Sequence, residues 1–156
     1  WLRSQATQEI EYLRRAYAYA TDRIGRDIDG EVEAGRLVYR RIFTEDAAIR
    51  ASGLEGTTTG PDAWVEVVRD ALGPMGPTQH LIGTQLVEID ALTLDEACRV
   101  ESGRARMDSH LQAWHTRADG KVWVFVGTYR DEVVYSPETG WQIAAMNLER
   151  TAEEVR

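Results

Sequence analysis

The stretch Gly76-Pro77-Thr78-Gln79-His80-Leu81-Ile82-Gly83-Thr84-Gln85-Leu86-Val87-Glu88-Ile89-Asp90 divides the chain into a helical first part and a second part with the pattern of strands. A turn with proline and glycine precedes it, and the following run is rich in apolar residues, so residues 78–89 are predicted to form a strand. His80 stands near the start of this strand, where the chain enters the core. The role of an imidazole at this point is the main question that the sequence raises.

Length and composition indicate a single globular domain over residues 1–156. The chain is 43% hydrophobic and 28% charged, which is typical of globular proteins, and no apolar run reaches the roughly 20 residues that span a bilayer. A net charge of −8 repels a phosphate backbone, so nucleic acid is not expected as a partner. Without an apolar span, no membrane partner is expected either, and the cytoplasm is the default location. The single cysteine, Cys98, excludes an internal disulfide and a cysteine-based structural metal site.

Helical periodicity precedes the histidine strand. The predicted helices span residues 7–24, 31–43 and 61–72. In the first, Ile10, Leu13 and Tyr17 fall on one face at helical spacing. The third begins at Gly60-Pro61, because proline suits the first helical position, where its missing N–H is not needed.

The other predicted elements are strands. They span residues 47–52, 78–89, 97–115, 121–135 and 141–148. Asp119-Gly120 is typical of a hairpin turn, and consecutive hairpins make an antiparallel sheet. Helices packed on one face of such a sheet give an α+β domain. The charged tail, residues 150–156, is expected to fray.

Three polar side chains fall where a core is expected. Asp22 lies at the end of the first helix, and His80 and His110 lie in strands. Each alone is compatible with a solvated or structural position. In combination, a carboxylate that accepts from one imidazole nitrogen fixes the tautomer and leaves the other nitrogen as a base. His115 is assigned to the approach to a hairpin and is given no role.

Neither a cofactor nor a metal is expected. The chain lacks the glycine-rich nucleotide motifs, the HExxH motif and the nucleophile elbow. Its only lysine, Lys121, lies in a turn, which argues against Schiff-base chemistry. Asp22, His80 and His110 are a conceivable set of two histidines and one carboxylate for a metal, but nothing in their spacing requires one.

Several short segments resemble the SnoaL-like family of the nuclear-transport-factor-2-like superfamily, which includes scytalone dehydratase. They are the first helix ending in Asp22, the sequences Phe43-Thr44-Glu45-Asp46-Ala47, Gly60-Pro61 and Thr78-Gln79-His80-Leu81-Ile82-Gly83, and the ending Gly140-Trp141-Gln142-Ile143. The resemblance covers nearly the whole chain. It implies a cone-shaped, curved antiparallel sheet, an alpha-beta barrel, wrapped around three N-terminal helices with a pocket inside.

The resemblance also implies site residues. Asp22 and His80 match the family's acid–base pair, His110 its second histidine, and Tyr17 a pocket tyrosine. Two tyrosines that scytalone dehydratase uses on its carbonyl fall here at Thr21 and about Ala51, which argues against scytalone as the substrate. The segment after Asp22 is longer than usual, and residues 24–35 are therefore expected to remodel one rim of the pocket.

The resulting hypothesis is a cofactor-independent lyase for a small hydrophobic, aromatic, hydroxylated substrate, with a dehydratase-type elimination as the leading reaction. A retro-aldol cleavage that releases formaldehyde from an aromatic diol, a double-bond isomerisation, and a non-catalytic binding or assembly module stay open. The candidate pocket residues are Trp64, Met75, Trp114, Phe125, Tyr129 and Met146. Arg104 and Arg106 are assigned to a solvated face. A homodimer or homotrimer is expected, formed through the strands at 97–115 and 121–135.

Overall fold

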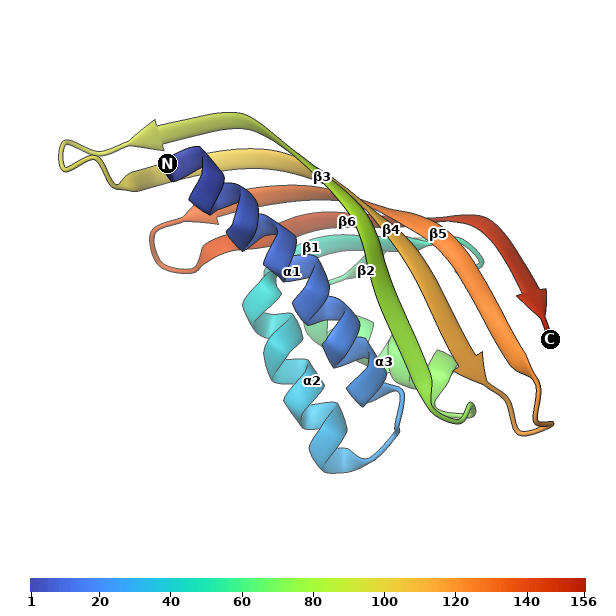
Figure 1. Ribbon diagram of the computed structural model, residues 1–156. Helices are drawn as coiled ribbons and strands as arrows, with labels where there is room; N and C mark the ends of the chain where they lie inside the picture. Colours follow the sequence, from blue (N-terminus) through green and yellow to red (C-terminus); the bar gives the residue numbers. More distant parts are fainter.

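The computed structural model describes residues 1–156 and contains three helices and a six-stranded sheet (Figure 1). The helices are α1 (Leu2–Ile24), α2 (Asp29–Ile42) and α3 (Pro61–Leu72). The strands are β1 (Phe43–Ala51), β2 (Thr58–Thr59), β3 (Thr78–Leu94), β4 (Val100–Thr116), β5 (Val122–Ser136) and β6 (Gly140–Val155). None of the helices is both long and apolar enough to cross a membrane.

The sheet has the strand order β2-β1-β6-β5-β4-β3 and is open at both edges. Its neighbours are antiparallel except β1 and β6, which run parallel. The long strands bend strongly, and the three helices lie on the inner side of the bend (Figure 1). The α+β class and the curved sheet are therefore confirmed, whereas the sheet does not close into a barrel.

The core lies between this inner face and the helices. In β4 and β5 the odd-numbered side chains point inward and are mostly buried, while the even-numbered side chains of β4 are mostly exposed. The predicted inner face of α1 is correct, because Ile10, Leu13 and Tyr17 are all buried. Tyr17 also stacks on Tyr39 of α2, with ring centroids 5.1 Å apart.

The structure corrects two of the sequence predictions for chain segments. The tail expected to fray continues β6 and pairs with β5, with Glu153 opposite Phe125 and Val155 opposite Trp123. Residues 53–60, for which the sequence predicted no helix or strand, include the short β2, which pairs with β1. The C-terminal extension of β6 matters for the site, because it carries Glu153 to the mouth of a cavity.

Gly127 of β5 marks a register shift between β5 and β6. A Cβ at this position would lie 2.6 Å from the carbonyl oxygen of Glu149 and 2.7 Å from Cε1 of Phe125. Because the first contact is with the backbone of the neighbouring strand, Gly127→Ala is expected to lower the free energy of unfolding by about 1–3 kcal/mol. Urea denaturation checks this. Gly30→Ala in α2, where a Cβ meets nothing within 4 Å, is the control, and equal stability of the two variants would contradict the prediction.

Candidate functional site

An apolar cavity of about 290 Å³ lies between the inner face of the sheet and helices α1 and α3. Of its 21 lining residues, 14 are hydrophobic, so it suits a mainly apolar molecule. The polar side chains in its wall are those of Thr21, Ser52, His80, His115, Arg150 and Glu153, together with the hydroxyls of Tyr17 and Tyr129.

Asp22 and His80 form a hydrogen-bonded pair beside this cavity. His80 Nδ1 lies 2.7 Å from Asp22 Oδ1. The same carboxylate accepts from the Thr78 hydroxyl at 3.0 Å and from the His80 backbone N–H at 3.1 Å. Since an ionised carboxylate only accepts, Nδ1 carries the proton and Nε2 keeps a lone pair. His80 lines the cavity, and this geometry suits a general base.

The carboxylate of Asp22 is not itself part of the cavity wall. It borders a separate, solvent-exposed hollow that is lined mainly by polar residues of α1, α2 and β3, including Arg23 and Glu31. The Asp22 side chain is 22% exposed, compared with 8% for that of His80. The pair therefore connects the apolar cavity to a polar surface behind it.

His115 is the second histidine of the site, although the sequence analysis gave it no role. Its ring meets that of His80 edge to face, with centroids 5.4 Å apart, and stacks on Trp123 at 4.4 Å. Its Nδ1 lies 3.2 Å from the Trp123 carbonyl oxygen. Because a carbonyl only accepts, Nδ1 is the donor and Nε2 is left with a lone pair. Burial, with a smaller contribution from His80, lowers the pKa of His115 to about 4.

This lowered pKa predicts a pH dependence of stability. Between pH 6.5 and about 4, unfolded His115 binds a proton that folded His115 does not, so the free energy of unfolding decreases as the pH falls through this window. His115→Phe removes this contribution and should flatten the dependence measured by urea denaturation at a series of pH values. His110→Gln is the matched control, because that ring is exposed in the folded protein. A slope unchanged by His115→Phe would contradict the prediction.

Tyr17 lies at the cavity wall, as expected. Its hydroxyl accepts a hydrogen bond from Trp64 Nε1 at 3.0 Å, and its ring meets that of Tyr129 edge to face at 5.5 Å. Burial raises the pKa of Tyr129 well above 10. The Tyr129 hydroxyl is therefore neutral at ordinary pH and acts as a donor rather than as an anion.

Three of the six predicted pocket residues line the cavity, and three do not. Trp64, Phe125 and Tyr129 are in its wall. Trp114 is an even-numbered residue of β4 and lies on the outer face, and Met75 packs half-buried against the core. The third residue outside the cavity wall is Met146. It is buried, and its Sδ lies 3.4 Å from Arg14 Nη1. No residue of the segment 24–35 lines the cavity, so the expectation that this segment remodels its rim is wrong.

The fold does not place His110 near the Asp22–His80 pair. Side chains of a strand alternate between its faces, and His110 is exposed on the outer face while His115 is buried on the inner one. The placement of His110 in the site is therefore wrong. The conceivable metal set of Asp22, His80 and His110 is likewise not assembled, and no group of three histidine, cysteine, aspartate or glutamate side chains is placed to hold a metal ion.

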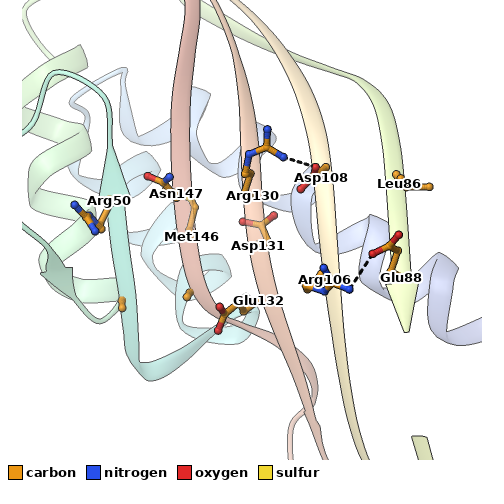
Figure 2. Close-up of a pocket in the computed structure, with 12 residues that line it drawn as sticks. Arg50, Leu86, Glu88, Arg106, Asp108, Arg130, Asp131, Glu132, Met146 and Asn147 are labelled. Atoms are coloured by element: carbon orange, nitrogen blue, oxygen red, sulfur yellow. Dashed lines mark hydrogen bonds and ion pairs between the residues drawn. The ribbon is translucent and has the colours of Figure 1, made fainter. Parts of the chain in front are cut away.

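A second hollow, of about 450 Å³, lies on the outer face of the sheet (Figure 2). Its wall is mostly charged, and four of the charged side chains form two ion pairs. Arg106 lies 3.0 Å from Glu88, and Arg130 lies 2.5 Å from Asp108. Arg104 and Arg106 are exposed, as expected. Because this hollow contains no histidine and no carboxylate–imidazole pair, the candidate site is the inner cavity.

Three helices on the inner side of an open curved sheet, with a carboxylate–imidazole pair at an apolar cavity, define a class of small α+β proteins with an internal pocket. The model of the SnoaL-like domain matches residues 3–147, and the chain belongs to this family. No curated protein matches the sequence.

Solved structures show the same fold. The Kfla4162 protein of Kribbella flavida is 24% identical, with a TM-score of 0.75 over 97% of this chain and 95% of that one. A type 2 hexachlorocyclohexane dehydrochlorinase (LinA) is 15% identical, with a TM-score of 0.75 over 99% and 90% of the two chains. A proposed scytalone dehydratase of Novosphingobium aromaticivorans is 17% identical, with a TM-score of 0.68 over 98% and 87%.

Proposed function

We propose that the protein is a cofactor-independent lyase that acts on a small, mainly apolar, hydroxylated substrate, with an aromatic ring favoured by the aromatic cavity wall. The observation that carries this proposal is the hydrogen bond between Asp22 and His80 at the edge of the cavity. Similarity to structures described as a dehydratase and a dehydrochlorinase supports an elimination. The leading reaction is the loss of water.

In the proposed mechanism, His80 Nε2 removes a proton from a substrate carbon. The C–O bond breaks as the C=C bond forms, and the hydroxyl leaves as water with the proton that the imidazolium returns. Asp22 holds the ring in the tautomer that exposes Nε2 and stabilises the imidazolium that forms. The imidazolium formed in this step faces a carboxylate that is already in place at 2.7 Å. We expect the base to contribute on the order of 10²–10⁴ in rate.

The oxygen of the leaving group needs a hydrogen-bond donor. We assign this role to Tyr17, whose hydroxyl lies at the cavity wall and is held there by the hydrogen bond that it accepts from Trp64. His115 fits a different role. Its pKa of about 4 keeps it neutral, so its free Nε2 accepts a hydrogen bond and orients a substrate hydroxyl rather than donating a proton.

The proposal is tested with a panel of aromatic and terpenoid alcohols, whose products are identified by mass spectrometry. Loss of water supports the dehydratase, release of an aldehyde supports C–C cleavage, and an unchanged mass with altered chromatographic retention supports an isomerase. Tight binding of several compounds without turnover would contradict the assignment as an enzyme and favour a binding module. Turnover that survives in His80→Gln would overturn the assigned base.

We also propose that the outer face of β4 and β5 pairs with a second copy of the chain. Alternating acidic and basic side chains on this face can pair across a two-fold axis, and Leu86 beside them is 62% exposed. Sedimentation analysis is expected to give a dimer, which Arg106→Glu should weaken, whereas a trimer would exclude the two-fold arrangement. A strict monomer would refute the proposal.

A further inference from the structure

A buried ion pair joins α1 to β5 beneath the cavity. Arg14 Nε lies 3.1 Å from Asp131 Oδ2, and Arg14 Nη2 contacts Asp131 Oδ1. Both side chains are fully buried. The two residues are 117 positions apart in the sequence, so the fold brings them together, and the two-point contact fixes the plane of the guanidinium.

The guanidinium lies against two tyrosine rings of the cavity wall. The Arg14 Cζ atom is 3.9 Å from the centroid of the Tyr129 ring and 4.5 Å from that of Tyr17. Both rings line the cavity, whereas Arg14 does not. A cation over an aromatic face attracts its electrons and favours the more negative form of a phenol. Arg14 therefore acts on the site only through these two tyrosines.

Stability alone gives a weak reason for this arrangement. Two charges removed from water lose their hydration. Apolar residues of similar volume at such a position often give equal or higher protein stability. The guanidinium of this pair nevertheless contacts the rings of both Tyr17 and Tyr129, the two tyrosines that line the cavity. We propose that Arg14, held by Asp131, is a positioning residue that fixes the rings of Tyr17 and Tyr129 and strengthens their hydroxyls as donors to a substrate oxygen.

This inference rests on the proposed function, in which such a donor assists the departing group. The charges around Tyr129 agree with it. Burial and the neighbouring Tyr17 raise the pKa of Tyr129, and Arg14 opposes this rise. The hydroxyl thus stays protonated, as a donor must, and the guanidinium makes its proton more acidic than it would be without that charge.

The double variant Arg14→Met/Asp131→Leu tests the inference, because it replaces both charges with apolar side chains of similar size. The protein is labelled with carbon-13 at the tyrosine Cζ atoms, and Tyr17→Phe and Tyr129→Phe assign the two signals. In the ligand-free double variant both signals are expected to shift and those of exposed Tyr12 and Tyr19 to stay. The control Arg130→Met/Asp108→Leu removes an exposed pair on the outer face and should shift neither. Unshifted Tyr17 and Tyr129 signals in a folded double variant would overturn the inference.

If the double variant does not fold, Arg14→Lys supplies the same test. Lysine keeps the charge but loses the planar two-point contact, so a smaller shift of the same two signals is expected. No shift would again overturn the inference. These measurements need no turnover, so their outcome is independent of whether His80 proves to be a base.

A bound dye gives a second readout. 4-Nitrophenol titrated in the cavity reports, through its phenolate absorbance, how well the site donates to a negative oxygen. The pKa of the bound dye is expected to rise by about one unit in Arg14→Met/Asp131→Leu, a tenfold change in proton affinity, and to stay unchanged in the outer-face control. An equal pKa in all three proteins would count against the inference.

Discussion

Substitution of His80 with glutamine is expected to lower kcat/KM by about 10²–10⁴-fold on any substrate found with the panel of alcohols. Glutamine has a similar reach and can still bond to Asp22, but it cannot take up a proton at neutral pH. The fold should be retained, since the His80 side chain lies at the cavity wall and its backbone N–H bond to Asp22 remains. Steady-state kinetics with matched thermal unfolding measures both effects.

His110→Gln is the matched control for this substitution. It removes an imidazole from the next strand, but from the outer face, and it should leave kcat/KM unchanged. Asp22→Asn should reduce kcat, because an amide can also donate and no longer fixes the tautomer of His80. Activity that depends on His110 and not on His80 would refute the site described above.

The second large effect is on stability. Arg14→Met alone leaves the Asp131 carboxylate buried without its partner, and the free energy of unfolding is expected to fall by about 3–5 kcal/mol. Burial already raises the pKa of Asp131 even with Arg14 present. Urea denaturation measures the loss, and the double variant with Asp131→Leu should recover most of it.

Arg130→Met provides the comparison for an exposed ion pair. Arg130 contacts Asp108 and Glu149 on the outer face, and all three side chains are about half exposed. Exposed pairs contribute about 0–1 kcal/mol. If Arg14→Met and Arg130→Met lowered the free energy of unfolding by similar amounts, burial would not explain the large loss expected for Arg14→Met.

Sequence periodicity predicted most of the fold. The stripe of Ile10, Leu13 and Tyr17 located α1, Gly60-Pro61 located the start of α3, and Asp119-Gly120 located a hairpin. The parallel pairing of β1 with β6 was not predictable in this way, because it depends on where the chain returns after α3 and three hairpin strands. The continuation of β6 was also missed, since its charged residues gave no apolar pattern.

Sequence also predicted the pair of Asp22 and His80, but it chose the wrong second histidine. The sequence of β4 did contain a pattern that distinguishes the two histidines. Ala105, Met107 and Leu111 are apolar at odd positions, and this alternation places His115 on their face and His110 on the opposite one. The pairing of Arg14 with Asp131 left no such signal, because a charged residue in an amphipathic helix is ordinarily solvated and its partner lies on a distant strand.

The hollow behind Asp22 lets water approach one side of the pair without entering the cavity. The carboxylate borders this polar hollow, whereas His80 faces the apolar cavity. In the proposed mechanism the proton taken up at Nε2 stays on the cavity side, where the departing hydroxyl carries it away as water, and the carboxylate that balances the imidazolium keeps part of its hydration. One partner thus remains wet while the other reacts in a dry pocket, and a single hydrogen bond joins the two environments.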